Sequence, residues 1–255
     1  MLEMKSLARG LRVLGCFTTQ APEWGAAELA RAIGVDRVMA WRTLRTLCAE
    51  NFVTQDPVTK RYRLGIRVIE LAGSVLANLD PFAEAKPHMA ALWQETQETV
   101  RFILRSGTMI VVANVLECPQ SVRIVGNMGR RVPMYCTAAG RVFLAFGSET
   151  LRQEALKGPL VAQTVHTLTD PNAILAQLKL IRRDGVAIDE EEMTEHASAI
   201  AVPIFNRGVH EPAACVAVMG PSVRLTRARL EALMPRMRNV GRSISQALGC
   251  TNLPF

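Results

Sequence analysis

The sequence lacks the features that mark secreted, disulfide-rich and membrane proteins. Its six cysteines are scattered without any CxxC pair, and a chain of 255 residues does not need disulfides to stabilise its core. No apolar stretch approaches the roughly 18 residues that span a bilayer. The amino-terminal residues mix Lys5, Arg9 and Arg12 with apolar residues, unlike a signal peptide. We therefore expect a cytoplasmic protein with reduced thiols and no membrane association.

Catalytic and metal-binding motifs are also missing. None of the four histidines stands in an HExxH or similar context, and side chains that bind metals do not pair at ligand spacing outside the acidic run at 189–192. That run is expected to be a solvated loop, so we predict no catalytic residue, no metal and no cofactor. One alternative stays open, a thiol-dependent enzyme or redox sensor that uses Cys136, with His166 or His196 elsewhere in the chain.

The basic residues are concentrated in one segment. The net charge of +7 is modest for the whole chain, but residues 37–67 hold seven Arg or Lys and only two acidic residues, a net charge of +5. Such a concentration is typical of a nucleic-acid contact surface, although a solvated basic face is the alternative. The 49% hydrophobic content can fill real cores, and we expect two domains of unequal size.

The amino-terminal third has the pattern of three helices followed by a hairpin. Apolar residues Leu7, Leu11, Leu14 and Phe17 recur at helical spacing, which predicts a helix over 7–18 with Ser6 as its N-cap. The elements that follow are a helix over 26–33 ended by Gly34, a helix over 37–51 capped by Asp36, and two short strands within 52–65. This order predicts a winged helix-turn-helix domain.

A helix of this kind fits the major groove, where arginine reads guanine edges, while wing cations neutralise phosphates. Leu44 and Leu47 are expected to face the core. The residues predicted to contact DNA are Arg37, Val38, Met39, Trp41, Arg42 and Arg45 on the third helix, and Lys60, Arg61 and Arg63 on the wing. For Trp41, a place in the core is the alternative.

The remaining chain predicts a linker helix and an α/β domain of the α+β kind. We expect domains at 1–65 and 83–250, joined by a helix over 66–82 whose apolar stripe can pair with a second copy. A mixed or antiparallel sheet flanked by helices is the natural packing. The expected helices span 82–97, 138–147, 172–184 and 226–248, and the expected strands span 99–105, 109–116, 121–126, 186–189, 198–206 and 212–219.

The segment 185–206 combines a glycine turn, four consecutive acids and an apolar run. Its pattern resembles the signature of IclR-type transcriptional regulators at Gly185, Asp189, Glu192, Ala199, Ile200, Ala201, Ile204, Phe205 and Asn206. Three further blocks, within 98–104, 129–145 and 213–221, follow the order of that family. The resemblance implies a winged helix-turn-helix domain and a GAF-like domain that binds a small organic acid. An architectural DNA-binding protein without a ligand is a further alternative.

The resemblance also implies the site residues. Backbone amides at a helix start near Ala138 and Ala139 would favour a carboxylate, although close helix packing and, for Asp189, a loop-ordering role are the alternatives. The implied effector-binding residues are Ile124, Val132, Met134, Thr137, Ala138, Ala139, Gly140, Asp189, Ala199, Ala217 and Met219.

Two departures from the family pattern carry expectations. Val38 and Met39 replace the usual Ser-Thr pair, so DNA affinity depends on the arginines and the wing. Ala199, Ala217 and Met219 stand where some members of the family have a cysteine and two serines, which favours an aromatic or alicyclic acid over a very small polar one. The expected partners are a double-stranded operator with an inverted repeat, near a catabolic operon, and further copies of the chain in a dimer or tetramer. Repression and activation both stay open.

Overall fold

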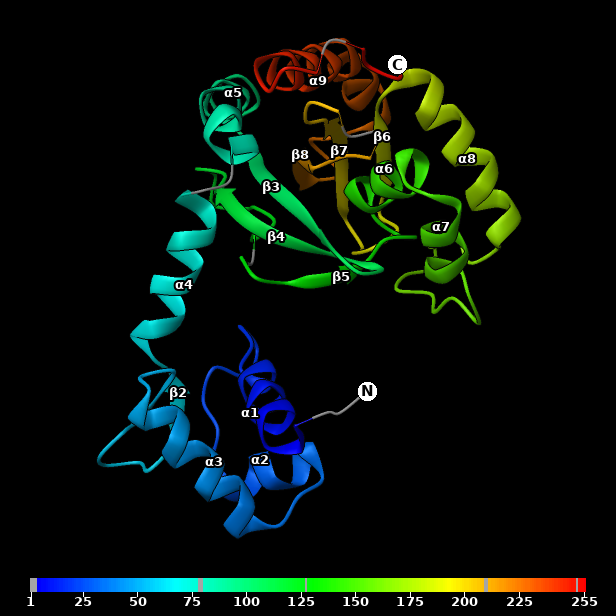
Figure 1. Ribbon diagram of the computed structural model, residues 1–255. Helices are drawn as coiled ribbons and strands as arrows, with labels where there is room; N and C mark the ends of the chain where they lie inside the picture. The colour runs from blue at the N-terminus through cyan, green and yellow to red at the C-terminus, as the bar shows by residue number, and fades with distance from the viewer. Residues whose placement is uncertain (1–3, 78–79, 127, 209–210, 251) are drawn as a thin grey trace. The chain divides into compact units, whose positions relative to one another are not determined.

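The computed structural model describes residues 4–77, 80–126, 128–208, 211–250 and 252–255 (Figure 1). Contacts between residues divide the chain into two units, Met1–Leu79 and Asp80–Phe255. The elements of the first unit are α1 (Lys5–Cys16), α2 (Ala26–Ile33), α3 (Arg37–Ala49), β1 (Val53–Gln55), β2 (Tyr62–Leu64) and α4 (Ile66–Ala77).

Local signals set the boundaries of the first unit's helices. Gly34 ends α2 in the left-handed conformation (φ 69°), which glycine adopts without steric cost. The Asp36 carboxylate accepts a hydrogen bond from the Met39 amide at 2.8 Å, so it caps α3 as predicted. Strands β1 and β2 pair antiparallel, with Val53 opposite Leu64. The predicted winged helix-turn-helix arrangement is confirmed.

Helix α1 differs from the expectation. It begins at Lys5 and its N-cap, Met4, makes no side-chain cap, so the prediction for Ser6 is wrong. Leu7 and Leu11 are 59% and 61% exposed, whereas the core of this unit takes Val13 from α1 and Phe17 from its C-cap. The packed face therefore keeps Leu14 and Phe17 of the predicted stripe, whereas Leu7 and Leu11 face solvent.

The second unit is a six-stranded sheet with helices on both faces. Its elements are α5 (Asp80–Thr96), β3 (Thr99–Ser106), β4 (Met109–Leu116), β5 (Arg131–Pro133), α6 (Ala138–Phe146), α7 (Glu149–Ala155), α8 (Pro171–Asp184), β6 (Ala187–Glu190), β7 (Ala197–Ile204), β8 (Ala214–Pro221) and α9 (Arg227–Ala247). The strand order is β5-β4-β3-β8-β7-β6, and every pair is antiparallel.

Alternate residues of each strand face different helices. Phe102 of β3 packs against Phe82 of α5 in a tilted arrangement, with ring centroids 5.1 Å apart, and Val202 of β7 lies under Gly241 of α9. On the opposite face, α6 packs across the sheet, with α8 outside it (Figure 1). Strands β7 and β8 are buried at all positions, so their sequences are continuous apolar runs rather than alternating ones.

The predicted strand at 121–126 is wrong. Its carbonyl groups accept hydrogen bonds from side chains instead of a neighbouring strand. Arg224 donates to Val122, Thr99 to Ile124 and Arg101 to Val125. The strand that pairs with β4 on the side away from β3 is β5, with Ile110 opposite Val132.

Two smaller differences concern helices. The short helix α7 was not predicted, and Ser148 caps it. The predicted linker helix over 66–82 is α4, which ends at Ala77, and Pro81 stands in the first turn of α5.

Candidate nucleic-acid surface and ligand cavity

The outer face of α3 presents the predicted residues to solvent. Arg37, Val38, Met39, Arg42 and Arg45 are all exposed. Trp41 is 47% exposed, so it does not belong to the core. The Arg45 guanidinium lies 5.4 Å from the centre of the Trp41 ring, close enough for a cation–π contact that orients both side chains. On the inner side, Leu44 is buried and Leu47 half-buried.

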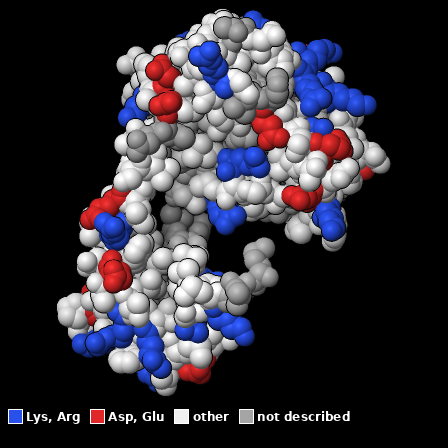
Figure 2. All heavy atoms as spheres, in the orientation of Figure 1, with Lys and Arg blue, Asp and Glu red and all other residues white. Residues whose placement is uncertain are grey.

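The hairpin between β1 and β2 carries the other predicted cations. Lys60 is exposed in the turn. Arg63 is exposed, although it pairs with Asp56 at 3.1 Å and Glu23 at 3.4 Å. Arg61 is half-buried and pairs with Glu28 of α2 at 2.8 Å, so this guanidinium ties the hairpin to α2. Figure 2 shows Lys and Arg side chains gathered over α3 and this hairpin.

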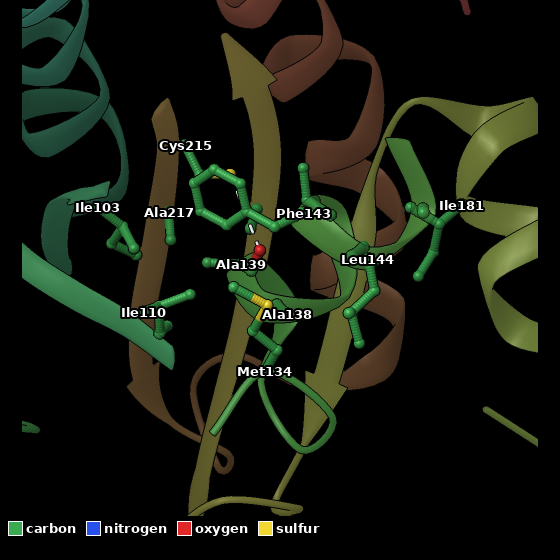
Figure 3. Packing of buried hydrophobic residues seen from close by; sticks show 14 of the residues in the cluster. Ile103, Ile110, Met134, Ala138, Ala139, Phe143, Leu144, Ile181, Cys215 and Ala217 are labelled. Atoms are coloured by element: carbon green, nitrogen blue, oxygen red, sulfur yellow. Dashed lines mark hydrogen bonds between the residues drawn. The ribbon is translucent and has the colours of Figure 1, made fainter. Parts of the chain in front are cut away.

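Between α6 and the sheet of the second unit lies a cavity of about 50 Å³. Eight of the eleven predicted effector-binding residues line it: Val132, Thr137, Ala138, Ala139, Asp189, Ala199, Ala217 and Met219. Figure 3 shows Ile103, Ile110 and Ala217 of the sheet pointing toward Ala138 and Ala139 of α6. Residues far apart in the sequence therefore line one cavity.

Strand register explains why these residues meet. Asp189 of β6 pairs with Ala199 of β7, which pairs with Met219 of β8, which pairs with Thr99 of β3. The neighbouring row on the same face joins Ala201, Ala217 and Arg101. Paired residues of antiparallel strands project to the same side, so alanines leave room in the middle of this face.

The start of α6 packs closely against the backbone of Met134. The Thr137 hydroxyl accepts a hydrogen bond from the Gly140 amide at 3.1 Å, and the first amides of a helix have no acceptor within it. A Cβ on Gly140 would lie 2.3 Å from the Cα of Met134, so packing requires glycine there. Gly140, buried Met134 and half-buried Ile124 do not line the cavity.

Asp189 has two roles in this geometry. Its carboxylate accepts a hydrogen bond from the Glu192 amide at 2.9 Å, which orders the acidic loop, and it also lines the cavity. Burial raises the pKa of Asp189 to about 7. Glu192 forms a buried, two-bond ion pair with Arg141 of α6. The segment predicted to be a solvated loop is therefore anchored to α6.

Sequence reasoning missed seven residues that line the cavity: Arg101, Ile103, Ile110, Val112, Arg130, Met193 and Thr194. The two arginines matter most, because the predicted site held no cation. The sequence feature that could have indicated a cation in the site is Arg101 itself, a charged residue within the apolar strand TVRFIL. The sequence-based site therefore lacked both cationic side chains of the cavity, Arg101 and Arg130.

The Cys136 thiol does not have the surroundings of a nucleophile. It is fully buried, and burial raises its pKa to about 12. Its sulfur lies 3.5 Å from the Met193 sulfur. Among the described residues, no group of three or more His, Cys, Asp or Glu side chains is arranged to hold a metal ion. None of the described helices has the length and apolarity needed to cross a bilayer.

Both units match known sequences. Residues 6–57 match the IclR helix-turn-helix domain, and residues 73–246 match the family described as bacterial transcriptional regulator IclR C-terminal. The chain belongs to the IclR family. It is a DNA-binding transcriptional regulator and not an enzyme, so the reading of Cys136 as a catalytic thiol is set aside.

Individual IclR proteins are similar over nearly their whole length. The HTH-type transcriptional regulator KdgR of Escherichia coli (strain K12) is 29% identical over 254 residues, covering 98% of this chain and 96% of the relative. The crystal structure of the IclR transcriptional regulator from Alicyclobacillus acidocaldarius has a TM-score of 0.88 at 27% identity, covering 97% and 100% of the two chains. An IclR homolog from Microbacterium hydrocarbonoxydans, complexed with 4-hydroxybenzoate, has a TM-score of 0.84 at 25% identity, covering 97% and 100%.

Proposed function

We propose that this IclR-family regulator binds an inverted-repeat operator through α3 and the β1–β2 hairpin and changes its affinity when an organic acid binds the cavity. The observation that carries the effector proposal is the convergence of eight predicted residues on one cavity. We place the protein in the cytoplasm, beside its operator, and expect it to control a catabolic operon.

The proposed DNA contact surface is the exposed face of α3. Arg37, Arg42 and Arg45 present guanidinium groups that can read guanine or bind phosphate. Val38 and Met39 stand between them and can contact thymine methyl groups. Lys60 and Arg63 are proposed to bind phosphates, whereas the pairing of Arg61 with Glu28 assigns it to the internal support of the hairpin.

We propose that α4 joins copies of the chain into a dimer or tetramer. Ile66, Ile69, Leu71 and Val75 are exposed along this helix. A helix that leaves so much apolar surface in water gains stability from a partner helix.

The proposed effector is an aromatic or alicyclic carboxylate. Ala199, Ala217 and Met219 give the middle of the cavity an apolar wall, and the structural relative from M. hydrocarbonoxydans is complexed with 4-hydroxybenzoate. The volume of about 50 Å³ is below the roughly 150 Å³ that admits benzene. Binding of a ring therefore requires the flexible side chains of Met193 and Met219 to move.

Calorimetric titration of the full-length protein tests this proposal. We expect 4-hydroxybenzoate and cyclohexanecarboxylate to bind and to alter operator affinity, while glyoxylate has little effect. Asp189→Ala should leave operator binding by the free protein near normal but reduce the response to the acid at least about tenfold, a loss of roughly 1.4 kcal/mol. Tight binding of glyoxylate, or a normal response of Asp189→Ala, would contradict the proposed effector class.

A further inference from the structure

The β3 side of the cavity holds two guanidinium groups that no expected role explains. Arg101 projects from the middle of β3, and Arg130 lies beside Val112 of β4, whose amide donates to the Arg130 carbonyl. Both side chains line the cavity and are half-buried. Neither forms an ion pair with a described residue.

Arg101 has more hydrogen-bond donors than partners. One terminal nitrogen donates to the Val125 carbonyl at 2.9 Å. Its Nε is fully buried and has no partner within the described part of the chain. A guanidinium presents five N–H groups, and an unsatisfied buried donor is costly. A ligand that accepts hydrogen bonds in the cavity would remove this cost.

The charges around Arg101 favour an anion. Its pKa is lowered to about 10, first by burial and second by the positive charge of Arg130, while Glu117 opposes the shift. The Glu117 carboxylate accepts a hydrogen bond from the Gly126 amide. Two cations that repel each other in a partly desolvated site are stabilised when a carboxylate lies between them.

We infer that the carboxylate of the effector binds to the guanidinium groups of Arg101 and Arg130, and that the rest of the ligand points along the sheet toward Asp189. This inference rests on the proposed function of the cavity. The start of α6 is the alternative binding position for the carboxylate, but a helix N-terminus supplies only about half a positive charge. Two arginines supply two whole charges.

Asp189 fixes the direction of the ligand. It stands on β6, three strands from Arg101 on β3, and three strand spacings amount to about 14 Å. When ionised, its carboxylate would repel a carboxylate at that end, and it can accept a hydrogen bond from a hydroxyl there. The cavity is therefore suited to a carboxylic acid with a hydrogen-bond donor at its far end.

The test compares an acid with its neutral amide on the full-length protein. The probes are 4-hydroxybenzoate and 4-hydroxybenzamide, and the variants are Arg101→Met, Arg101→Lys and the control Arg105→Met, which alters an exposed arginine paired with Glu211 outside the cavity. We expect the wild type and Arg105→Met to prefer the acid by about 30-fold or more. Arg101→Met should lose most of this preference. Arg101→Lys should retain part of it, because lysine keeps the positive charge but cannot donate the two parallel hydrogen bonds of a guanidinium.

The outcomes separate this inference from the proposed function. If Arg101→Met weakens acid and amide equally, or keeps the preference, the carboxylate binds elsewhere and only the inference is overturned. If the wild type binds neither probe, both the inference and the proposed effector class are contradicted. Melting temperatures of the variants without ligand show whether Arg101→Met is folded, and Arg130→Met provides a second, independent loss of charge.

Discussion

At the scale of single residues, replacing Arg42 tests whether operator binding depends on the exposed face of α3 or only on positive charge in the first unit. We expect Arg42→Ala to weaken operator binding about tenfold, since one lost arginine contact costs roughly 1–3 kcal/mol. Arg31→Ala is the matched control, because Arg31 is exposed in the same unit but lies on α2. Fluorescence anisotropy with a labelled operator measures both variants. Equal losses would show that α3 is not the reading helix.

Asp189 makes stability depend on pH. Its pKa in the folded protein is about 7, above the ordinary value of 3.8. The folded state therefore binds more protons, and its stability falls as pH rises between these values. We expect Asp189→Asn to be more stable than the wild type at pH 8 by roughly 1 to 3 kcal/mol, with no gain at pH 4. Urea unfolding at both pH values measures the difference, and a gain of the same size at both would contradict the assignment.

At the scale of elements, the start of α6 depends on close packing against Met134. Gly140→Ala places a Cβ 2.3 Å from the Met134 backbone, so we expect a loss of about 1–3 kcal/mol in unfolding free energy. Gly15→Ala in α1 meets no atom within 4 Å and should stabilise by about 0.5–1 kcal/mol. Denaturant unfolding compares the pair. A harmless Gly140→Ala would show that α6 can shift away from the sheet.

At the scale of the whole molecule, pairing through α4 should produce the operator symmetry. We expect Ile69→Asp to lower the mass in sedimentation from an even multiple of 28.0 kDa toward that of the single chain, because it introduces a charge into the apolar face of α4. The wild type should protect an inverted repeat with half-sites about one helical turn or a multiple apart. Protection should decline steeply as salt rises.

The control for this last prediction is Val58→Asp, which alters an exposed apolar residue of the hairpin. It should leave the mass unchanged. A multimer that persists in Ile69→Asp, together with an unchanged footprint, would place the interface elsewhere in the chain.

Much of this architecture was predictable because it depends on local signals. Asp36 and Gly34 fix helix ends through bonds and backbone conformations within a few residues. The apolar runs of β7 and β8 identify strands buried on both faces. The resemblance at 185–206 located Asp189 and Ala199, and the cavity contains both.

The features that could not be predicted depend on contacts between segments far apart in the sequence. The segment 121–126 has the composition of a strand, but side chains of Thr99, Arg101 and Arg224 take its carbonyls, and none of these contacts is local. Arg101 enters the cavity because β3 pairs with β8 in a register that places it beside Ala217. Sequence periodicity decides which residues share a face of one strand, whereas only the pairing of strands decides which side chains, and which charges, share one cavity.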